Sequence, residues 1–438
     1  MNLKPNVVIL LTDCLRWDYF NNMKIKKEVD LVLENAYSPA PSTFFAVPSL
    51  ITGTFPFEVI NDSIIPREFP FYLPRILEDF GYNNIFITGN IVTSRYFGYK
   101  QGEIKFYEDF IYKKEQDVKI VEHILNTRSK PKVEKLRDKL KEFLKSKAPA
   151  VATFLKKGVR AYRDLRRTIN LFGEFNDQNS SYQAKVRGEE IIASFEDALN
   201  EISKRPVFAF LHLMDTHSPY GPPDLGNKTL AKYEKTMRKL NYAPSKLTEA
   251  EKKIIKELYT KEVHYLDKNL KKLLNLIWNK LGYDNTLVVI LSDHGELLGE
   301  NGLFTHPGFV LAQELLHIPI ALSGGPLKKI ILRRNALLSS IFVYYFILNL
   351  VTNRQTSLLD MQEILSVGYK RDKLYEYHPF NLFYKTNSKE AIYILEHSPE
   401  IYSKFNALLQ RRRRRILTAK IRKIEKKFWL PDIGPLHL

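Results

Sequence analysis

The sequence has very little cysteine: Cys14 is the single one in 438 residues, so no disulfide can form within the chain. This usage is typical of a reducing compartment. The first apolar run, Val7 to Leu11, is short, has no small-residue cleavage site after it and leads into Asp13. We therefore predict no signal peptide and expect a cytoplasmic location.

Long apolar runs are also missing. The longest, Ala336 to Val351, has about 16 residues with polar side chains among them, whereas a membrane-spanning helix needs roughly 20. We expect this segment to form a buried helix.

Acidic residues do not balance the basic ones, and the net charge is +18. Residues 128–167 hold 15 basic and 4 acidic residues, and residues 411–427 hold 10 and 1, so the rest of the chain is nearly neutral. We predict a basic helical insertion at about 113–172, because apolar residues recur there at helical spacing, and a basic tail containing Arg411–Arg415.

Three interpretations of these basic segments stay open: a solvated helical surface, peripheral contact with an anionic membrane at its inner face, and, for the insertion, a substrate lid. A nucleic acid is a poor candidate partner, because the chain shows neither an aromatic RNA-binding signature nor zinc-finger spacing.

Strand and helix patterns alternate along the chain, which predicts a mostly parallel sheet covered by helices. The expected strands are 7–12, 85–88, 207–213 and 286–292. The expected helices are 71–80, 249–281 and one that begins at Pro48. We divide the chain into a catalytic domain at 1–325 and a C-terminal region at 326–438 with a small subdomain and the basic tail.

Two of these strands end in potential metal ligands. Asp13 follows the first strand, and Asp293 and His294 follow the last one. Ligands gather at the carboxyl edge of the strands in open α/β sheets, so these three side chains are candidates for one divalent ion. Such an ion can polarise a phosphoryl or sulfuryl oxygen and lower the pKa of a bound hydroxyl.

A loop rich in hydroxyl groups, residues 38–53, supplies a candidate nucleophile. A hydroxyl just before a helix lies close to backbone N–H groups that favour an anion, and beside a metal ion it becomes a plausible nucleophile. We choose Thr43. Cys14 is interpreted as a packing residue, and His212, His264 and His317 as core residues.

The chain resembles the sulfatase branch of the alkaline phosphatase superfamily over roughly residues 4–325. The motifs are PNVVILLTD followed by Arg16 and Asp18, then SLITGTFP, FLHLMDTHSPYGPP and SDHGELLGENGLFTHPG, in the order and spacing of that family. The resemblance implies an alkaline-phosphatase-like α/β sandwich with helices on both faces of a mostly parallel sheet.

The resemblance also implies the residues of the site. It assigns Thr43 as nucleophile, Asp13, Asp293 and His294 as metal ligands, and His217 as a group near the leaving oxygen. His306 matches a position that binds a second ion in two-metal relatives, and Asp215 is a candidate to join it. The implied cofactor is one or two divalent ions, with Ca, Mg, Mn and Zn as candidates.

Several departures from the family pattern bear on the chemistry. Typical sulfatases have Cys-x-Pro-Ser-Arg at the nucleophile, where the cysteine or a serine becomes formylglycine; this chain has Thr43-Phe44-Phe45-Ala46-Val47. The usual Asp-Asp pair is Asp13-Cys14 here, and the Gly-Lys-Trp-His segment aligns with residues 89–92. Threonine cannot form the aldehyde by the usual route.

We therefore expect a metal-dependent, sulfatase-like hydrolase of sulfate or phosphate esters that uses Thr43 and acts on a small-molecule or polymer ester. A phosphodiesterase or phosphoglycerol-type transferase at a membrane surface is the first alternative. A catalytically silent protein that binds a membrane or a polyanion is the second.

Overall fold

The structure is a computed structural model and describes residues 4–56, 69, 71–110, 185–202, 206–330, 334–353, 363–373, 376–386 and 390–394. The predicted basic insertion and the arginine-rich tail lie outside the described residues.

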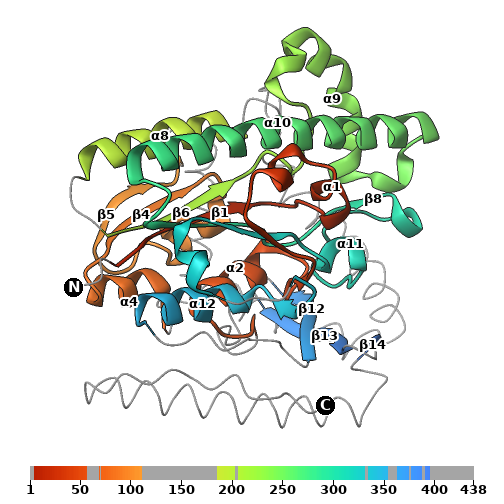
Figure 1. Ribbon diagram of the computed structural model, residues 1–438. Helices are drawn as coiled ribbons and strands as arrows, with labels where there is room; N and C mark the ends of the chain where they lie inside the picture. The colour runs from red at the N-terminus through yellow and green to blue at the C-terminus, as the bar shows by residue number, and fades with distance from the viewer. Residues whose placement is uncertain are drawn as a thin grey trace, which may run out of the picture.

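A seven-stranded sheet forms the centre of the molecule, in the order β2-β10-β7-β1-β6-β4-β5 (Figure 1). Only β10 runs antiparallel to its neighbours, so the expected mostly parallel α/β sheet is confirmed. The strands are β1 (Asn6–Thr12), β2 (Leu31–Leu33), β4 (Asn83–Thr88), β5 (Ile104–Glu108), β6 (Val207–Leu213), β7 (Thr286–Ser292) and β10 (Ile320–Ser323).

The register explains why distant parts of the chain meet. β1 lies between β7 and β6, with Thr12 opposite both Ser292 and Leu213. The three parallel strands therefore end at the same level, and the residues that follow them emerge at one edge of the sheet. The backbone N–H of Asp13 still donates to the carbonyl of Leu213, at 2.9 Å.

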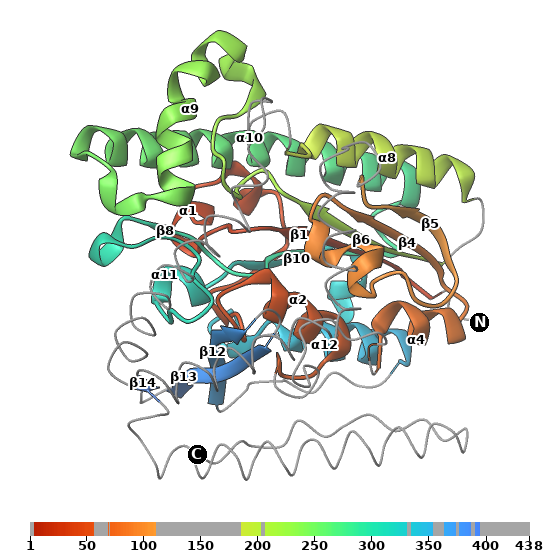
Figure 2. The ribbon, with the colours of Figure 1, turned by 180° about the vertical axis from the view of Figure 1, so that it is seen from behind.

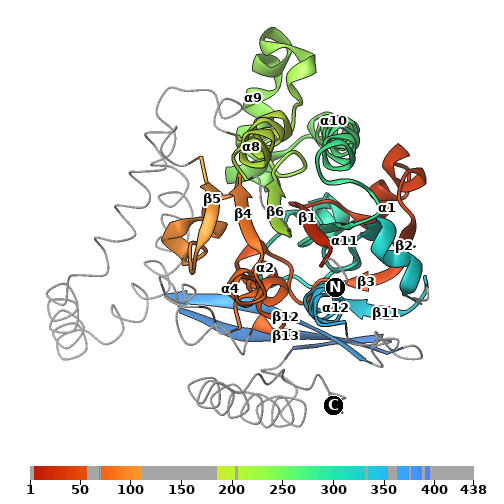
Figure 3. The same cartoon turned by 60° about the vertical axis from the view of Figure 1, so that its left-hand side comes forward.

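Every residue of β1, β6 and β7 is buried, because helices cover both faces of the central sheet. Consecutive residues of β1, such as Ile9 and Leu10, point to opposite faces of the sheet and belong to two different hydrophobic clusters. Figure 3 shows one helical layer on each side of the sheet. One layer holds α2 (Thr43–Thr52), α4 (Leu73–Asp79) and α12 (Ile341–Val351), and the other holds α8 (Gly188–Glu201), α9 (Asn227–Tyr242) and α10 (Glu249–Leu281).

The long helix α10 has the bounds expected from its sequence. Thr248 caps its first turn by accepting from the backbone N–H of Glu251, whose carboxylate accepts in return from the backbone N–H of Thr248. At the other end Gly282 takes a φ of 79°, which a glycine adopts readily.

Two sequence-based expectations need correction. α2 begins at Thr43, five residues before Pro48, so Thr43 lies in the first helical turn and not in the preceding loop. Residues 336–351 do not form one helix: β11 (Leu337–Ser339) pairs with β3 (Asn35–Tyr37), and α12 begins only at Ile341.

A small antiparallel sheet follows α12, made of β12 (Glu363–Lys373), β13 (Glu376–Thr386) and β14 (Glu390–Ile394). Figure 2 shows it beyond α2 and α12, away from the central sheet. The Ser366 hydroxyl donates to the carbonyl of Ser38 at 2.5 Å, in the loop before α2. The main core extends to Val351 in α12, and the predicted division at residue 325 stays a prediction.

The described residues also include the short elements α1 (Trp17–Phe20), α11 (Gln313–Leu316), β8 (Leu297–Leu298) and β9 (Phe304–Thr305). Among the described residues, none of the helices combines the length and the apolar character that crossing a bilayer requires.

Candidate active site

The carboxyl edge of β1 and β7 and the N-terminus of α2 meet in a buried cluster. The Thr43 hydroxyl lies 2.8 Å from Oδ2 of Asp293, 3.2 Å from Nε2 of His294 and 3.4 Å from Oδ2 of Asp13. Both carboxylates and the imidazole are at most 2% exposed, and Thr43 is 5% exposed. The structure thus brings together the candidate nucleophile and the three candidate metal ligands chosen from the sequence.

The orientation of these groups is set by backbone contacts. Asp293 Oδ1 accepts from the N–H of His294 at 2.8 Å and of Cys14 at 3.3 Å, which leaves Oδ2 toward Thr43. Nδ1 of His294 lies 2.8 Å from the carbonyl of Gly295. A carbonyl only accepts, so Nδ1 carries the proton and Nε2 keeps a free lone pair beside Thr43.

The electrostatics of the cluster favour a cation. Burial, and then the charge of Asp13, raise the pKa of Asp293 to about 7. Burial alone would raise the pKa of Asp13 too, but His217, His212 and His294 together lower it well below its usual value. Burial and the neighbouring His306 lower the pKa of His294 to about 4. Two buried carboxylates with a neutral imidazole form a donor set that fits a divalent ion.

A second group of donors, made of Cys14, His217 and His306, lies next to this cluster. The ring of His306 lies 4.6 Å from that of His294 and 5.1 Å from that of His217, between centroids. Cys14 Sγ lies 3.4 Å from Nδ1 of His306 and 3.0 Å from Oδ1 of Asp13. Ligand atoms of Cys14, His217 and His306 lie within 4.8 Å of one another, so Cys14, which we had interpreted as a packing residue, is part of the site.

The pKa values of the two histidines of this second group, His306 and His217, shift in opposite directions. Burial disfavours the charged form of His306, but the Glu296 carboxylate, 3.1 Å from Nδ1, outweighs it and raises the pKa of His306 to about 9. Burial lowers the pKa of His217, although Asp13 opposes this. Nδ1 of His217 donates to the carbonyl of Ser218 at 2.6 Å, so Nε2 is the nitrogen left for chemistry.

His212 was expected to be a core residue, and it is fully buried in β6, but it also contacts a candidate metal ligand. Its Nε2 lies 3.3 Å from Oδ2 of Asp13, and its Nδ1 lies 3.1 Å from the hydroxyl of Thr93. It joins Asp13 and Asp293 in a third group of donor atoms close enough to share an ion. A polar residue one position before the end of an otherwise apolar strand was the available signal.

Asn90 is a further residue that the sequence did not single out as functional. It stands where the family has lysine, and its Nδ2 donates to Oδ2 of Asp13 at 2.7 Å. The neutral amide thus orients a candidate metal ligand, and it brings no positive charge to the site.

Asp215, a candidate for a second ion together with His306, lies elsewhere. Its Oδ1 accepts from the backbone N–H of Gly188 at 3.0 Å, at the start of α8. Burial, and then Glu262, raise the pKa of Asp215 to about 6. The turn that follows β6 directs this side chain toward α8 and α10, so it does not join the histidine cluster.

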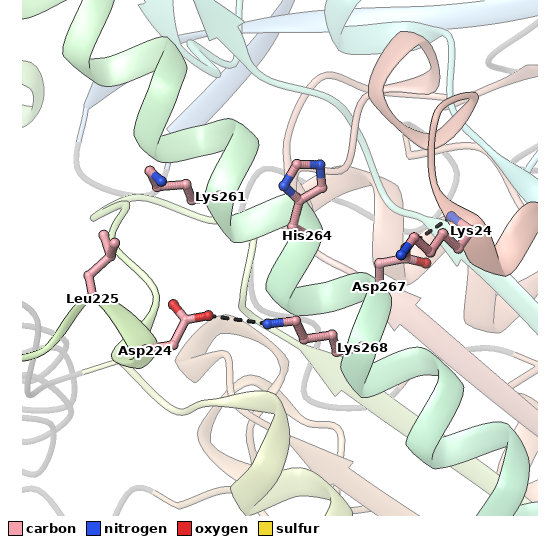
Figure 4. A pocket seen from close by; sticks show the side chains of 7 residues that line it. All are labelled: Lys24, Asp224, Leu225, Lys261, His264, Asp267 and Lys268. Atoms are coloured by element: carbon pink, nitrogen blue, oxygen red, sulfur yellow. Dashed lines mark hydrogen bonds and ion pairs between the residues drawn. The ribbon is translucent and has the colours of Figure 1, made fainter.

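Two other histidines are separate from the site. His317 stacks between Trp17 and Tyr37, with centroids 5.0 Å away on each side, which indicates a structural role. His264 was expected in the core but is exposed on α10. It lines a surface hollow of about 600 Å³ together with three lysines (Figure 4).

The donor set fits a metal ion. Asp13, Asp293 and His294 each place one ligand atom within 3.4 Å of the Thr43 hydroxyl. Three overlapping groups have ligand atoms close enough to share an ion: Asp13 with His212 and Asp293, Asp13 with Cys14 and His294, and Cys14 with His217 and His306. Carboxylate and imidazole ligands suit Zn²⁺ and Mn²⁺, and a nearby thiol favours Zn²⁺ among the ions considered.

The fold, a mostly parallel α/β sheet between two helical layers, is of the alkaline-phosphatase-like type. A sequence model of the Sulfatase family matches residues 5–353, and the chain belongs to this family.

Individual relatives agree with this assignment. The chain is 28% identical over 144 residues to the phosphoethanolamine transferase EptA of Helicobacter pylori; the match covers 32% of this chain and 26% of that protein, so about a quarter of the relative's length is spanned.

Among solved structures, a 2-O GAG sulfatase has a TM-score of 0.54 at 14% identity, covering 94% of this chain and 92% of that one. The C-terminal periplasmic domain of EptC from Escherichia coli, solved in complex with Zn, has a TM-score of 0.50 at 12% identity, covering 86% and 93%. These likenesses show the fold.

Proposed function

We propose that this protein transfers a substituted phosphoryl group from a phosphodiester, through a covalent ester on Thr43. The observation that carries the proposal is the position of the Thr43 hydroxyl, 2.8 Å from one buried carboxylate and 3.2 Å from a histidine nitrogen. The preferred donor is a phospholipid headgroup, which makes the enzyme a transferase or phosphodiesterase that works at a membrane face.

The identity of the nucleophile supports phosphate over sulfate chemistry. A threonine side chain cannot become the formylglycine of typical sulfatases, because its Cβ carries a methyl group. The arginine that accompanies the sulfatase nucleophile is replaced by Val47, and the lysine by Asn90. A relative that matches part of the chain is named a phosphoethanolamine transferase, which supports a phosphodiester substrate.

The residues of the chain divide the reaction into two displacements. Asp293 Oδ2 is close enough to accept the Thr43 proton as Oγ1 attacks phosphorus. The negative charge of a phosphodiester bound beside His217 favours the imidazolium form of this residue. The P–O bond to the leaving alcohol breaks, and protonated His217 gives its Nε2 proton to that oxygen. Neutral His217 then takes a proton from the acceptor hydroxyl, whose oxygen attacks phosphorus. The P–O bond to Thr43 breaks, and Oγ1 takes its proton back from Asp293; the acceptor is water in a hydrolase.

Two fixed features help with the negative charge of the phosphoryl group. The N-terminus of α2 carries the positive end of the helix dipole beside Thr43. A divalent ion bound by Asp13, Asp293 and His294 would neutralise phosphoryl oxygens and lower the pKa of the nucleophile.

The test is to trap the covalent ester. Purified protein is incubated with a fluorescent phosphatidylethanolamine in mixed micelles, with Zn²⁺ or Mn²⁺, and the peptide containing Thr43 is analysed by mass spectrometry. We expect a phosphoethanolamine adduct on Thr43, and release of fluorescent diacylglycerol.

Variants of matched shape give the controls. Thr43→Val keeps the volume of the side chain but has no hydroxyl, and we expect adduct and product to disappear while the thermal transition changes little. Thr43→Ser keeps a hydroxyl and should still form the adduct. Adduct formation by Thr43→Val would overturn the assignment of the nucleophile.

Sulfate-ester hydrolysis is the second candidate, because the chain belongs to the Sulfatase family. Nitrophenyl sulfate and bis-nitrophenyl phosphate are offered side by side with each metal ion. A clear preference for the sulfate by protein with an unmodified Thr43 would overturn the phosphodiester proposal. The cytoplasmic location expected from the sequence stays a prediction.

A further inference from the structure

We infer that Lys185, a buried residue outside the metal-ligand cluster, is a positioning residue that fixes the segment carrying His217. The inference rests on the proposed function where it concerns catalysis. Its structural part, that Lys185 holds residues 215–221 in place, stands without it.

The surroundings of the Lys185 ammonium are unusual for a lysine. Its side chain is 4% exposed, and Nζ has four oxygen acceptors within 3.2 Å. Three are carbonyl oxygens of one short segment, at 2.5 Å from Asp215, 2.6 Å from His217 and 3.2 Å from Pro219; the fourth is Oε1 of Glu262 in α10, at 3.1 Å.

These carbonyls belong to alternate residues of the segment. The ammonium group of Lys185 therefore binds every second carbonyl of this segment, as a bound metal cation would. Burial lowers the pKa of Lys185 to about 8, although Glu262 opposes this, so the ammonium is the main form at neutral pH. Replacing it with an apolar group would leave buried carbonyls without a donor.

A second contact fixes the far end of the segment. Oε1 of Glu262 also accepts from the backbone N–H of Gly221 at 2.9 Å and from Nη1 of Arg187 at 2.9 Å. Nη2 of Arg187 donates to the carbonyl of Gly221 at 3.0 Å. Lys185 and Arg187, both just before α8, thus hold residues 215–221 against α10.

The contact has a direct consequence for His217. The carbonyl of Ser218, which accepts from Nδ1 of His217, lies between two carbonyls that Lys185 holds. Fixing residues 217 and 219 fixes the direction of the Ser218 carbonyl. That carbonyl then keeps a proton on Nδ1. Nε2 has no such contact and can exchange a proton with the leaving or incoming oxygen.

The first experiment measures the segment itself. Hydrogen–deuterium exchange is followed in wild-type protein, Lys185→Met and Lys272→Met. Lys272 is an exposed lysine of α10 that pairs with Glu189 of α8, so it controls for the loss of a lysine contact between these elements. We expect backbone exchange across residues 214–221 to rise roughly tenfold in Lys185→Met only. Unchanged exchange would overturn the inference.

The second experiment measures catalysis with two phosphodiesters that differ in their leaving group. An alkyl leaving group needs the proton from His217, whereas nitrophenolate leaves without it. We expect Lys185→Met to lower kcat for the alkyl ester by roughly 10²-fold, with little change in KM or in turnover of the nitrophenyl ester. Equal losses for both esters would indicate a general loss of stability and overturn the positioning role.

A rescue experiment separates a local effect from misfolding. In Lys185→Ala, added propylammonium can refill the space with an N–H donor, while tetramethylammonium cannot donate. We expect only propylammonium to restore turnover of the alkyl ester and slow exchange at residues 214–221. If wild-type protein turns over neither ester, the proposed function fails, and the exchange measurements still decide the role of Lys185.

Discussion

Thr43 limits the chemistry of the site at the level of single atoms. Its hydroxyl is the nucleophile candidate closest to the carboxylates, and its neighbours Phe44 and Val47 bring no charge. The anionic group must therefore be held by the helix N-terminus, by histidine side chains and by a bound cation. A phosphodiester carries one negative charge and a phosphate monoester up to two, so the diester needs less positive charge from such a site.

Asp215 gives a prediction that depends on pH. Its pKa is about 6 in the folded protein and 3.8 as a free side chain, so the folded state binds the proton more tightly. The contribution of this group to stability is therefore lost as pH rises from about 4 to about 6. The shift corresponds to at most roughly 3 kcal/mol.

We expect Asp215→Asn to remove this penalty and keep the acceptor for the Gly188 N–H. The difference in unfolding free energy between variant and wild type should grow by up to roughly 3 kcal/mol between pH 4 and pH 7. Urea unfolding of both proteins across this range measures it. Parallel pH profiles of the two proteins would contradict the prediction.

At the scale of elements, the C-terminus of α2 is fitted closely against α12. Gly53 ends α2 with a φ of 66°, and a Cβ there would lie 2.3 Å from Cδ1 of Tyr344 in α12. Gly53→Ala therefore combines backbone strain with a steric clash, and we expect a loss of roughly 2–4 kcal/mol in unfolding free energy.

Gly81→Ala is the matched control for this prediction. Gly81 also has a positive φ, 84°, but no atom lies within 4 Å of its added Cβ, so only the backbone cost should appear. Adding Tyr344→Leu to Gly53→Ala should recover part of the loss. Chemical denaturation measures both comparisons, and equal losses in Gly53→Ala and Gly81→Ala would show that the clash is relieved without cost.

The elements also show what sequence patterns can predict. β6, β7 and α10 have the predicted bounds, because continuous apolar runs and a capping box mark them clearly. The start of α2 was missed because proline favours the first turn of a helix, whereas Pro48 lies in its second turn. The missing N–H of Pro48 costs one backbone hydrogen bond that packing must offset.

Within the site, the sequence could place residues at strand ends but not the directions of their side chains. Asp13 and Asp293 follow buried parallel strands, and the register alone brings them together. His212 and Asp215 both follow this logic on β6, yet one faces Asp13 and the other faces α8. A strand buried on both sides has no polar face in its pattern, so that choice depends on tertiary packing.

At the scale of the whole molecule, the stability of the metal-free protein depends on the protonation of Asp293. Burial and Asp13 raise the pKa of Asp293 to about 7, so the contribution of this group to stability is lost as pH rises from about 4 to about 7. The two carboxylates are then charged, buried and close together. A divalent ion that binds only the folded state offsets this loss, by about 2.7 kcal/mol at a concentration of one hundred times Kd.

This balance predicts opposite effects of one substitution with and without metal. Asp293→Asn removes a buried charge, so in chelator at pH 8 we expect its thermal transition to lie above that of the wild type. With Zn²⁺ or Mn²⁺ added, the wild-type transition should rise and the variant should respond little, which reverses the order. Differential scanning calorimetry in chelator and in excess metal measures both. An unchanged wild-type transition temperature on addition of metal would remove the basis for placing an ion between Asp13 and Asp293, because a cation held there must stabilise the folded state.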